Sequence, residues 1–337
     1  MDKDLIVIAG GAGYIGSCCA RMLHGQGRRV AVLDDLSSGH ARAVEGLPFE
    51  RVDLLDVPAL DRAFASCPGV SEVMLFAGRI SVPESVRDPE AYYLNNLVGA
   101  HNLIKAMLDH GAERIVFSSS AAVYGVPDRV PIPEDAALRP ISPYGRTKKQ
   151  LEEALDDLAA AGRLRYASLR YFNASGAEPD GLHGEDHRPE THLIPLAVAA
   201  GLGRRPPLKV FGDDYDTPDG SCVRDYVHVR DLARAHLMAL ERLRKGQGKG
   251  DVFNLGCGMG ASVLEVLRAV SRALGTDVPF EIAPRRPGDP PRLVASAAKI
   301  RRETGWEPAF DLDGIVETAV AWHRNHPDGY GPEEVAP

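Results

Sequence analysis

A glycine-rich turn near the N-terminus constrains the fold of this 337-residue chain more than any other segment. Leu5 to Ala9 form a short apolar run, and Tyr14 to Leu23 carry apolar residues at helical spacing. Between them, Gly10, Gly13 and Gly16 form the pattern Gly-x-x-Gly-x-x-Gly. In a strand–turn–helix unit the first glycine permits the tight turn, the second lets the backbone approach a pyrophosphate, and the third allows close helix packing. The segment therefore predicts a dinucleotide-binding unit.

The following residues alternate apolar runs with helical patterns. The apolar runs cover 29–33, 73–77, 114–117 and 166–171, and the helical patterns cover 58–65, 89–110 and 143–161. This alternation is typical of a parallel sheet with helices on both faces. We expect an α/β fold, with a Rossmann-type doubly wound parallel sheet and a smaller, irregular α/β substrate domain.

The regular alternation of apolar runs and helical patterns ends at Asn173. We expect residues 1–173 to form the dinucleotide-binding Rossmann domain. Residues 174–337 contain Pro- and Gly-rich loops between short elements, and are expected to form mainly the substrate-binding domain. Residues 225–258 include another helical pattern and strand, so the chain is expected to return to the first domain there.

Composition excludes several classes of partner. Lys and Arg total 39 against 47 Asp and Glu, and the resulting net charge of −8 offers no broad basic face to nucleic acid or to an anionic membrane. No stretch approaches the ~20 apolar residues of a membrane span. The five cysteines are an odd number without Cys-x-x-Cys spacing, which favours a reducing compartment over a disulfide framework or zinc site. We therefore expect a cytoplasmic protein.

The type of dinucleotide is indicated by an acidic residue at the end of the second strand. Asp34 lies 18 residues after Gly16, close to the ~20-residue offset at which a carboxylate binds the adenosine ribose hydroxyls. Because a carboxylate repels a 2′-phosphate, NAD is favoured over NADP. Tyr14 and Ile15 open the helix whose N-terminus faces the phosphates. Asp53 and Leu54, at the end of the third strand, are candidates to hold the adenine.

A serine, a tyrosine and a lysine suggest proton chemistry. Tyr144 and Lys148 are four residues apart, on one helical face. Ser118 to Ser120 end a strand at the sheet edge where ligands of such folds bind. A free phenol titrates near pH ~10, so an adjacent ammonium and a nicotinium ring must stabilise the phenolate for it to act as a base. We predict Ser120, Tyr144 and Lys148 as the catalytic residues.

Several further motifs resemble the extended short-chain dehydrogenase/reductase family over almost the whole chain, and within it the UDP-sugar 4-epimerases. They are Gly10-Gly11-Ala12-Gly13-Tyr14-Ile15-Gly16-Ser17, Phe76-Ala77-Gly78, Tyr92 to Asn96, Ser118 to Gly125, Ser142-Pro143-Tyr144-Gly145 with Lys148, Arg170 to Asn173, Val223 to Val229, and Arg285-Arg286-Pro287-Gly288-Asp289. Several of these motifs are specific to nucleotide-sugar enzymes rather than to the fold.

The resemblance implies roles for further residues. Those expected to line NAD are Phe76, Ala77, Asn95, Ser118, Tyr144, Lys148, Tyr171 and Phe172. Those expected to contact the UDP-sugar are Ser120, Tyr144, Asn173, His192, Leu193, Phe211, Arg224, Arg286, Asp289 and Leu293. Arginine suits a diphosphate because its planar fork binds such groups in a bidentate manner. Surface ion pairing is the competing interpretation for either arginine alone.

The residues after Ser120 select among the reactions of the family. Related 4,6-dehydratases carry an acid and a base there, whereas this chain has Ala121 and Ala122. The resemblance therefore implies an isomerase that epimerises C4 of a UDP-hexose through a 4-keto intermediate, with NAD bound throughout and no net redox change. UDP-glucuronate or UDP-pentose 4-epimerisation and a net nucleotide-sugar oxidoreductase stay open. A non-catalytic nucleotide-binding regulator would not need Ser120, Tyr144 and Lys148 together.

The chain departs from the family pattern at some positions. Ile80 stands where many members have a lysine that contacts the cofactor, and Arg79 precedes it. The loop from His183 to His187, with His192 beyond it, carries metal-ligand residue types, but its spacing matches no zinc pattern and the reaction needs no Lewis acid, so we expect no metal.

Two further expectations rest on the family alone. Leu293 replaces a Tyr that in relatives excludes N-acetyl groups, so UDP-N-acetylglucosamine is a predicted second substrate; a plain core role for Leu293 is equally compatible with the sequence. A homodimer through the helices at 89–110 and 143–161 is expected.

Overall fold

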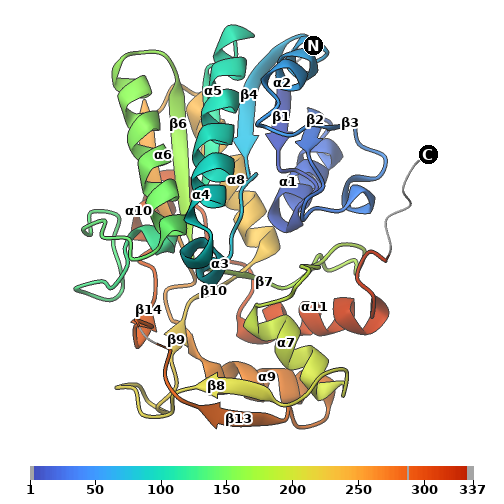
Figure 1. The fold of residues 1–337 in the computed structure, drawn as a ribbon, viewed down its shortest axis with the longest axis vertical. Coiled ribbons are helices and arrows are strands. Elements are labelled where there is room, and N and C mark those ends of the chain that lie inside the picture. Colours follow the sequence, from blue (N-terminus) through green and yellow to red (C-terminus); the bar gives the residue numbers. More distant parts are fainter. Residues whose placement is uncertain (1–3, 287, 332–337) are drawn as a thin grey trace.

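A large parallel sheet forms the centre of the computed structural model, which describes residues 4–286 and 288–331 (Figure 1). Its seven strands follow the order β11-β6-β5-β4-β1-β2-β3, and every neighbouring pair is parallel. The strands are β1 (Leu5–Ala9), β2 (Arg29–Asp34), β3 (Phe49–Arg51), β4 (Val70–Leu75), β5 (Arg114–Ser120), β6 (Arg165–Tyr171) and β11 (Gly250–Leu255). The expected α/β fold with a doubly wound parallel sheet is confirmed.

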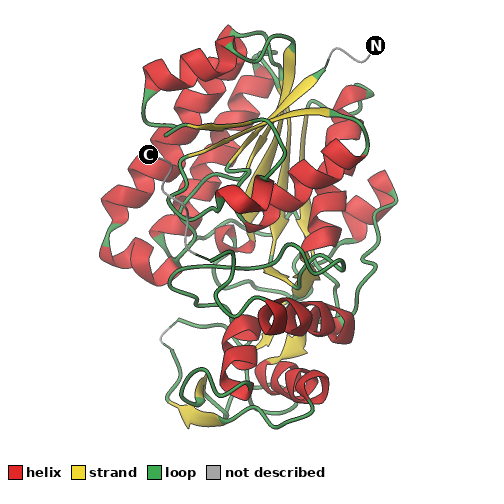
Figure 2. Ribbon diagram, turned by 90° about the vertical axis from the view of Figure 1, so that its right-hand side faces the viewer, coloured by secondary structure: helices red, strands yellow, loops and turns green. Residues whose placement is uncertain are grey.

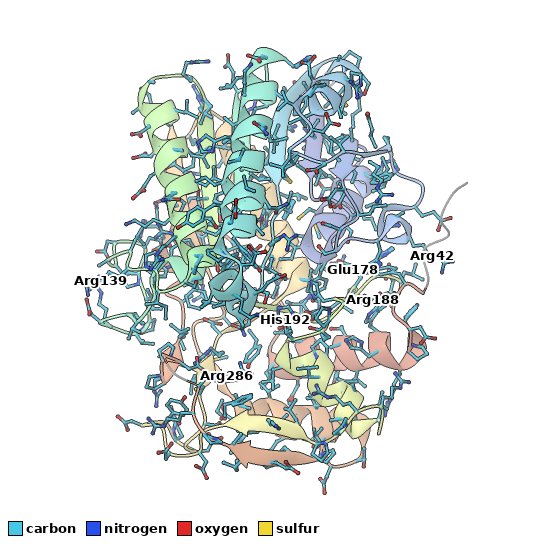
Figure 3. All side chains as sticks on the ribbon, in the orientation of Figure 1. Arg42, Arg139, Glu178, Arg188, His192 and Arg286 are labelled. Atoms are coloured by element: carbon cyan, nitrogen blue, oxygen red, sulfur yellow. The ribbon has the colours of Figure 1, made fainter. Side chains whose placement is uncertain are left out.

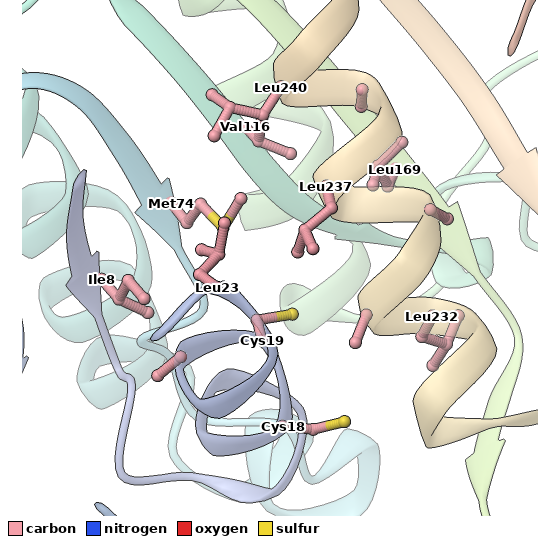
Figure 4. Packing of buried hydrophobic residues seen from close by; sticks show 14 of the residues in the cluster. Ile8, Cys18, Cys19, Leu23, Met74, Val116, Leu169, Leu232, Leu237 and Leu240 are labelled. Carbon is pink, nitrogen blue, oxygen red and sulfur yellow. The ribbon is translucent and has the colours of Figure 1, made fainter. Parts of the chain in front are cut away.

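Helices cover both faces of this sheet because its strands are apolar on both sides. On one face lie α1 (Tyr14–Gly25) and α8 (Val229–Arg244), and on the other α2 (Val57–Ala65), α5 (Ala100–Asp109) and α6 (Pro143–Ala160). In β1, Ile6 and Ile8 belong to the first core and Leu5 and Val7 to the second, as strand alternation requires. Figure 4 shows the first core, where Leu23 of α1 lies opposite leucines of α8.

The strand order reverses between β1 and β4, and ligands of open α/β sheets bind outside the carboxyl ends of the strands at such a point. The second domain lies beyond these same strand ends (Figures 1 and 2). Its helices α7 (Leu193–Gly201), α9 (Val263–Leu274) and α11 (Leu312–Asn325) pack into a core of their own. The fold thus leaves the site between the large sheet and the second domain.

Short strands complete the second domain and connect it to the first. They are β7 (Asn173–Ser175) paired with β10 (Tyr226–His228), β8 (Leu208–Phe211) paired with β13 (Phe280–Ala283), and β9 (Val223–Arg224) between β12 (Ala261–Ser262) and β14 (Arg292–Leu293). The chain returns to the large sheet through α8 and β11, and again through α10 (Ala298–Thr304) and Trp306, whose ring is fully buried in the first core. This second return was not predicted from the sequence.

One long predicted helix, 89–110, consists of three consecutive segments. These are α4 (Pro89–Tyr92), the π-helical η2 (Tyr93–Gly99) and α5. The short helices η1 (Ala41–Val44), α3 (Val82–Arg87) and η3 (Ala121–Val123) were not predicted. Among the described residues, we find no helix that combines the length and apolarity needed to cross a bilayer.

Candidate active site

Two of the three glycines in the first turn are required by the packing of the protein itself. A Cβ on Gly10, which has φ +77°, would lie 2.2 Å from the Ala77 nitrogen, and a Cβ on Gly16 would lie 2.3 Å from the Gly10 oxygen. Gly13 differs, because its Cβ would meet only the Gly10 oxygen, at 3.4 Å. Gly13 also caps α1 without a side-chain hydrogen bond to the first-turn N–H groups. The turn therefore fits a phosphate group at the start of α1.

Asp34 lies at this turn, as its position at the end of β2 requires. Its carboxylate accepts hydrogen bonds from the backbone N–H groups of Ala12 and Leu36, both at 2.9 Å, and the residue is buried. Asp53 is exposed and accepts a hydrogen bond from the Leu55 N–H at 2.8 Å. The buried carboxylate beside the glycine turn fits the ribose contact expected for NAD.

The segment after β4 borders the same turn. The N–H groups of Phe76 and Ala77 both donate to the Ala9 carbonyl, at 2.8 and 3.0 Å. The Asn95 side-chain oxygen accepts from the Arg79 N–H at 3.2 Å. The buried Asn96, which the sequence analysis missed, accepts from the same N–H at 2.7 Å and donates to the Arg79 carbonyl at 2.9 Å. These bonds fix the loop that carries Phe76 and Ala77.

Ser120, Tyr144 and Lys148 come together at the carboxyl end of β5. Tyr144, the second residue of α6, is 8% exposed, and the Ser120 side chain favours its ionised form. Lys148, one turn further along α6, donates from Nζ to the Ser118 carbonyl at 2.8 Å. Its Nζ lies 5.8 Å from the centroid of the Tyr144 ring. Ser120 also pairs in register with Tyr171 of β6, which brings this second tyrosine to the same edge.

Burial controls the ionisation of this group. It raises the pKa of Tyr144, an effect partly offset by the hydrogen bond to Ser120. Burial also lowers the pKa of Lys148 to about 8, although the carboxylate of Glu152 favours the ammonium. The tyrosine is therefore neutral in the protein alone, and a second positive charge is needed before it can act as a base near neutral pH.

His236 on α8 was not predicted, yet it lies beside these residues. Its Nδ1 is 2.8 Å from the Leu232 carbonyl, so that nitrogen carries the proton and Nε2 accepts from the Ser118 hydroxyl at 2.9 Å. Its ring lies 4.8 Å from that of Phe76. Complete burial lowers the pKa of His236 to about 4, so the ring is neutral at ordinary pH. His236 therefore orients Ser118 without adding a charge.

Behind the serines, a buried ion pair supports the strand ends. Arg170 binds Glu152 through two nitrogens and donates to the Tyr124 hydroxyl at 2.8 Å. Ser119 donates to the same carboxylate, and Tyr124 donates to Asn254 at 2.7 Å. Because every member is hydrogen-bonded, the network fixes the positions of β5, β6 and α6.

The second domain contributes residues predicted to bind the substrate. Arg224 pairs with Asp289, and the guanidinium of Arg286 lies 3.9 Å from the centroid of the Phe211 ring. Leu293 is opposite Arg224 in the register of β9 and β14. It packs against the cluster of Val123, Tyr124 and Ile132, which follows Ser120 in the chain. Figure 3 shows Arg286 in the second domain and His192 between the two domains.

Three other predicted contacts lie at the junction of the domains. Asn173 is in β7, in register with Tyr226 of β10. Leu193 is the first residue of α7, and His192 caps that helix. The side chain of His192 binds the carboxylates of Glu185 and Glu190, so it belongs to a separate cluster.

Comparison with known proteins decides the family. The NAD dependent epimerase/dehydratase family matches residues 6–256. This chain belongs to that family. It is 48% identical to the UDP-glucose 4-epimerase of Halalkalibacterium halodurans over 329 residues, 97% of this chain and 98% of that protein.

Two solved structures of 4-epimerases are similar over nearly the whole chain. The UDP-glucose 4-epimerase of Brucella ovis in complex with NAD is 47% identical, with TM-score 0.91, over 94% of this chain and 97% of its own. The UDP-Glc/GlcNAc 4-epimerase of Campylobacter jejuni is 40% identical, with TM-score 0.84, over 96% and 99%.

The two positions after Ser120 are those at which an acid and a base would be needed for elimination. Ala121 and Ala122 lie in η3, and the Ala122 N–H donates to the Ser120 hydroxyl at 3.2 Å. Neither side chain is able to exchange a proton. Ile80 is exposed, and its neighbour Arg79 pairs with Glu84 at 3.4 Å, so that guanidinium is held at the surface.

A pocket of about 640 Å³ lies elsewhere on this epimerase-family fold. It is lined by residues such as Arg28, Phe49 and Cys67, around β2 and β3, and it includes none of the predicted site residues. We assign the chemistry to the sheet edge instead, because the titratable groups and the glycine turn converge there.

Proposed function

We propose that this protein is an NAD-dependent UDP-hexose 4-epimerase, an isomerase that interconverts UDP-galactose and UDP-glucose through a 4-keto intermediate. The observation that carries the proposal is the grouping of Ser120, Tyr144 and Lys148 at the same carboxyl edge of the sheet as the glycine turn, with alanines at the two positions after Ser120. A hydride and one proton are moved by this machinery, but no second acid or base is present there for elimination. The similarity to named UDP-glucose 4-epimerases supports the same activity.

Three side chains have separate roles in the proposed proton transfer. Tyr144, as phenolate, accepts the proton of the sugar C4 hydroxyl, and Ser120 hydrogen-bonds the same oxygen. Lys148 supplies the nearby positive charge that stabilises the phenolate. NAD, held by the glycine turn and Asp34, would supply the hydride acceptor and donor for C4.

Epimerisation requires the keto sugar to present both faces in turn. The protein must therefore bind the substrate mainly through its nucleotide and diphosphate, for which Arg224 and Arg286 are the proposed partners. Tyr144 then returns the proton to the C4 oxygen, whichever face has received the hydride. A single acid/base serves both directions of the reaction.

The cofactor stays bound through the cycle because it is regenerated in every turnover. Gly10, Gly13, Gly16, Tyr14 and Ile15 are the proposed phosphate-binding segment, and Asp34 the proposed ribose partner. The remaining proposed contacts are Asp53, Leu54, Phe76, Ala77, Asn95, Ser118, Tyr171 and Phe172. The burial of Asp34 and its bonds to the turn support this assignment.

UDP-N-acetylglucosamine is a second proposed substrate. Leu293 lies beside Arg224 and against Val123 and Tyr124, between a proposed diphosphate ligand and the strand end that carries Ser120. This location supports a role beside the sugar ring, and leucine leaves more room there than tyrosine. The similar Campylobacter jejuni protein is described as a UDP-Glc/GlcNAc 4-epimerase.

The proposal also includes the oligomeric state and the cellular compartment of the protein. A homodimer is supported by the exposed apolar side chains of Leu94 and Val98 on η2, which packs beside α6. A reducing compartment, the cytoplasm, is supported by the free thiols of all five cysteines.

The direct test uses purified protein and UDP-galactose without added NAD. The proposal predicts UDP-glucose by anion-exchange chromatography, with no NADH absorbance in the protein-free filtrate. NADH that accumulates in step with substrate would instead identify a net oxidoreductase. Tyr144→Phe is the matched control for contaminating epimerase.

A further inference from the structure

The loop between β7 and α7 contains a short sequence repeat. Glu185-Asp186-His187 is followed five residues later by Glu190-Thr191-His192, so Glu-x-His occurs twice. No metal was expected from the sequence, because the spacing matches no familiar zinc motif and the reaction needs no Lewis acid. The structure folds this loop so that the four Glu and His side chains meet, with their ligand atoms all within 4.8 Å of one another.

The distances between these atoms suit a common coordination sphere. His192 Nδ1 lies 2.7 Å from a Glu185 oxygen and 2.9 Å from a Glu190 oxygen. His187 Nδ1 lies 3.1 and 3.7 Å from oxygens of the same two carboxylates. Ligands held at the usual ~2.0–2.2 Å from one ion are about 3.0 Å apart in octahedral and about 3.4 Å apart in tetrahedral geometry. These four nitrogen–oxygen distances, from 2.7 to 3.7 Å, bracket both values, and all the ligand atoms lie within 4.8 Å of one another.

Charge balance points the same way. Glu185 is buried, and within the described part of the chain its carboxylate is bonded to the two imidazoles alone. Two carboxylates and two neutral imidazoles carry a charge of −2, which one divalent cation neutralises.

We propose that Glu185, His187, Glu190 and His192 form a structural binding site for one divalent transition-metal ion, with Zn²⁺ as the expected occupant. Two imidazole nitrogens and two carboxylate oxygens form a ligand set of intermediate softness, which suits Zn²⁺ better than Mg²⁺ or Ca²⁺. Four protein ligands leave no open position, so the role is structural rather than catalytic.

The site joins elements of both domains. The His187 ring makes an edge contact, 6.2 Å between centroids, with Tyr14, the first residue of α1 after the glycine turn. The Glu185 carbonyl accepts from the Trp322 indole of α11 at 3.0 Å, and His192 directly precedes Leu193, the first residue of α7. A bound ion therefore fixes this loop between the proposed cofactor-binding helix and two helices of the second domain.

An ion has a route to the site from solvent. Glu185, His187 and Glu190 line a pocket of about 520 Å³ that also includes His323 and His326 on α11 and just after it. The His192 side chain is 39% exposed. The site is thus accessible to added metal and to chelators without unfolding.

The experiment uses the full chain without a histidine tag, stripped by a chelator and then titrated with Zn²⁺ and separately with Co²⁺. Elemental analysis after gel filtration gives the stoichiometry, and the visible absorption of Co²⁺ reports the coordination geometry. We expect one Zn²⁺ per chain, tetrahedral Co²⁺ bands, and a rise in melting temperature of about 4 °C at a hundredfold excess over Kd. None of these readouts depends on the proposed epimerase activity.

Variants assign the site. His187→Gln with His192→Gln is expected to abolish stoichiometric metal and the thermal shift, whereas the exposed His24→Gln of α1 retains both. If the double variant does not fold, the half-exposed His192→Asn alone is expected to weaken Zn²⁺ binding at least tenfold. If no metal is bound even at saturating Zn²⁺, the four residues form only an ion-paired cluster, and the proposal is overturned. Equal metal in the variants, or binding without a thermal shift, would also overturn it.

Discussion

Replacing Lys148 with Met removes the positive charge nearest to Tyr144 and keeps most of the side-chain volume. The Lys148 Nζ lies 5.8 Å from the centroid of the Tyr144 ring. At an effective dielectric constant of ~20, a unit charge at that distance stabilises the phenolate by roughly 3 kcal/mol. This equals about 2 pKa units, since one unit is ~1.36 kcal/mol. The acidic limb of the kcat profile for UDP-galactose should therefore move about 2 pH units to the alkaline side.

The assay follows UDP-glucose formation from pH 6 to 10 in the wild type and three variants. Lys148→Arg keeps the charge and should retain most of the normal profile. Lys149→Met removes the neighbouring lysine, which pairs with Glu153 at the surface, and should change nothing. A Lys148→Met profile that overlays the wild type would refute the electrostatic role of this lysine, as would an equal shift in Lys149→Met.

Lys148→Met is also expected to change the stability of the fold, and this change is favourable although the effect on catalysis is unfavourable. Burial lowers the pKa of Lys148 from 10.5 to about 8, so the unfolded chain binds this proton more tightly and the ammonium destabilises the fold below pH 8. This cost is relieved as the pH rises from about 8 to 10.5. Lys148→Met should therefore have a higher melting temperature than the wild type at pH 7.5. Loss of the hydrogen bond to the Ser118 carbonyl makes this increase smaller. The difference in melting temperature should shrink by pH 10. A difference independent of pH would contradict the buried charge.

Three further substitutions test other parts of the site. Tyr144→Phe should retain the fold and NAD but lower kcat by at least ~10², and a near-normal rate would exclude this tyrosine as the acid/base. Asp34→Ala should reduce the NAD that survives gel filtration and weaken discrimination against NADP, whereas the neighbouring Asp35→Ala should not; equal retention in both would count against Asp34. Leu293→Tyr should lose activity on UDP-N-acetylglucosamine and keep the glucose reaction, and parallel loss on both substrates would show that Leu293 is not the gate.

The sequence was sufficient for features that depend on local geometry. The glycine at position 16 is forced by backbone contacts with Gly10 and Gly11 inside one strand–turn–helix unit, so its spacing predicts the turn, whereas the contacts that force Gly10 come from Phe76 and Ala77 after β4. Tyr144 and Lys148 share a helical face by their spacing alone. The apolar runs predicted a parallel sheet because strands covered on both faces lack polar alternation.

Features that depend on long-range packing were not predictable in this way. His236 reaches Ser118 because α8 packs across β5, and the two residues are 118 positions apart. Trp306 returns to the first core after a long passage through the second domain. Glu185 and His192 meet only because of the path of an irregular loop, for which no periodic pattern exists. In each case the missing information is the relative position of two elements.

In the proposed mechanism, a hydride leaves C4 of the sugar and returns to the same carbon. UDP-galactose with deuterium at C4 tests it directly, with product examined by NMR and mass spectrometry. We expect UDP-glucose that keeps the deuterium at C4, with none in the medium or in a soluble nicotinamide. Deuterium found at C6 would indicate a dehydratase, and deuterium in free cofactor would indicate a net oxidoreductase; either result would contradict the account.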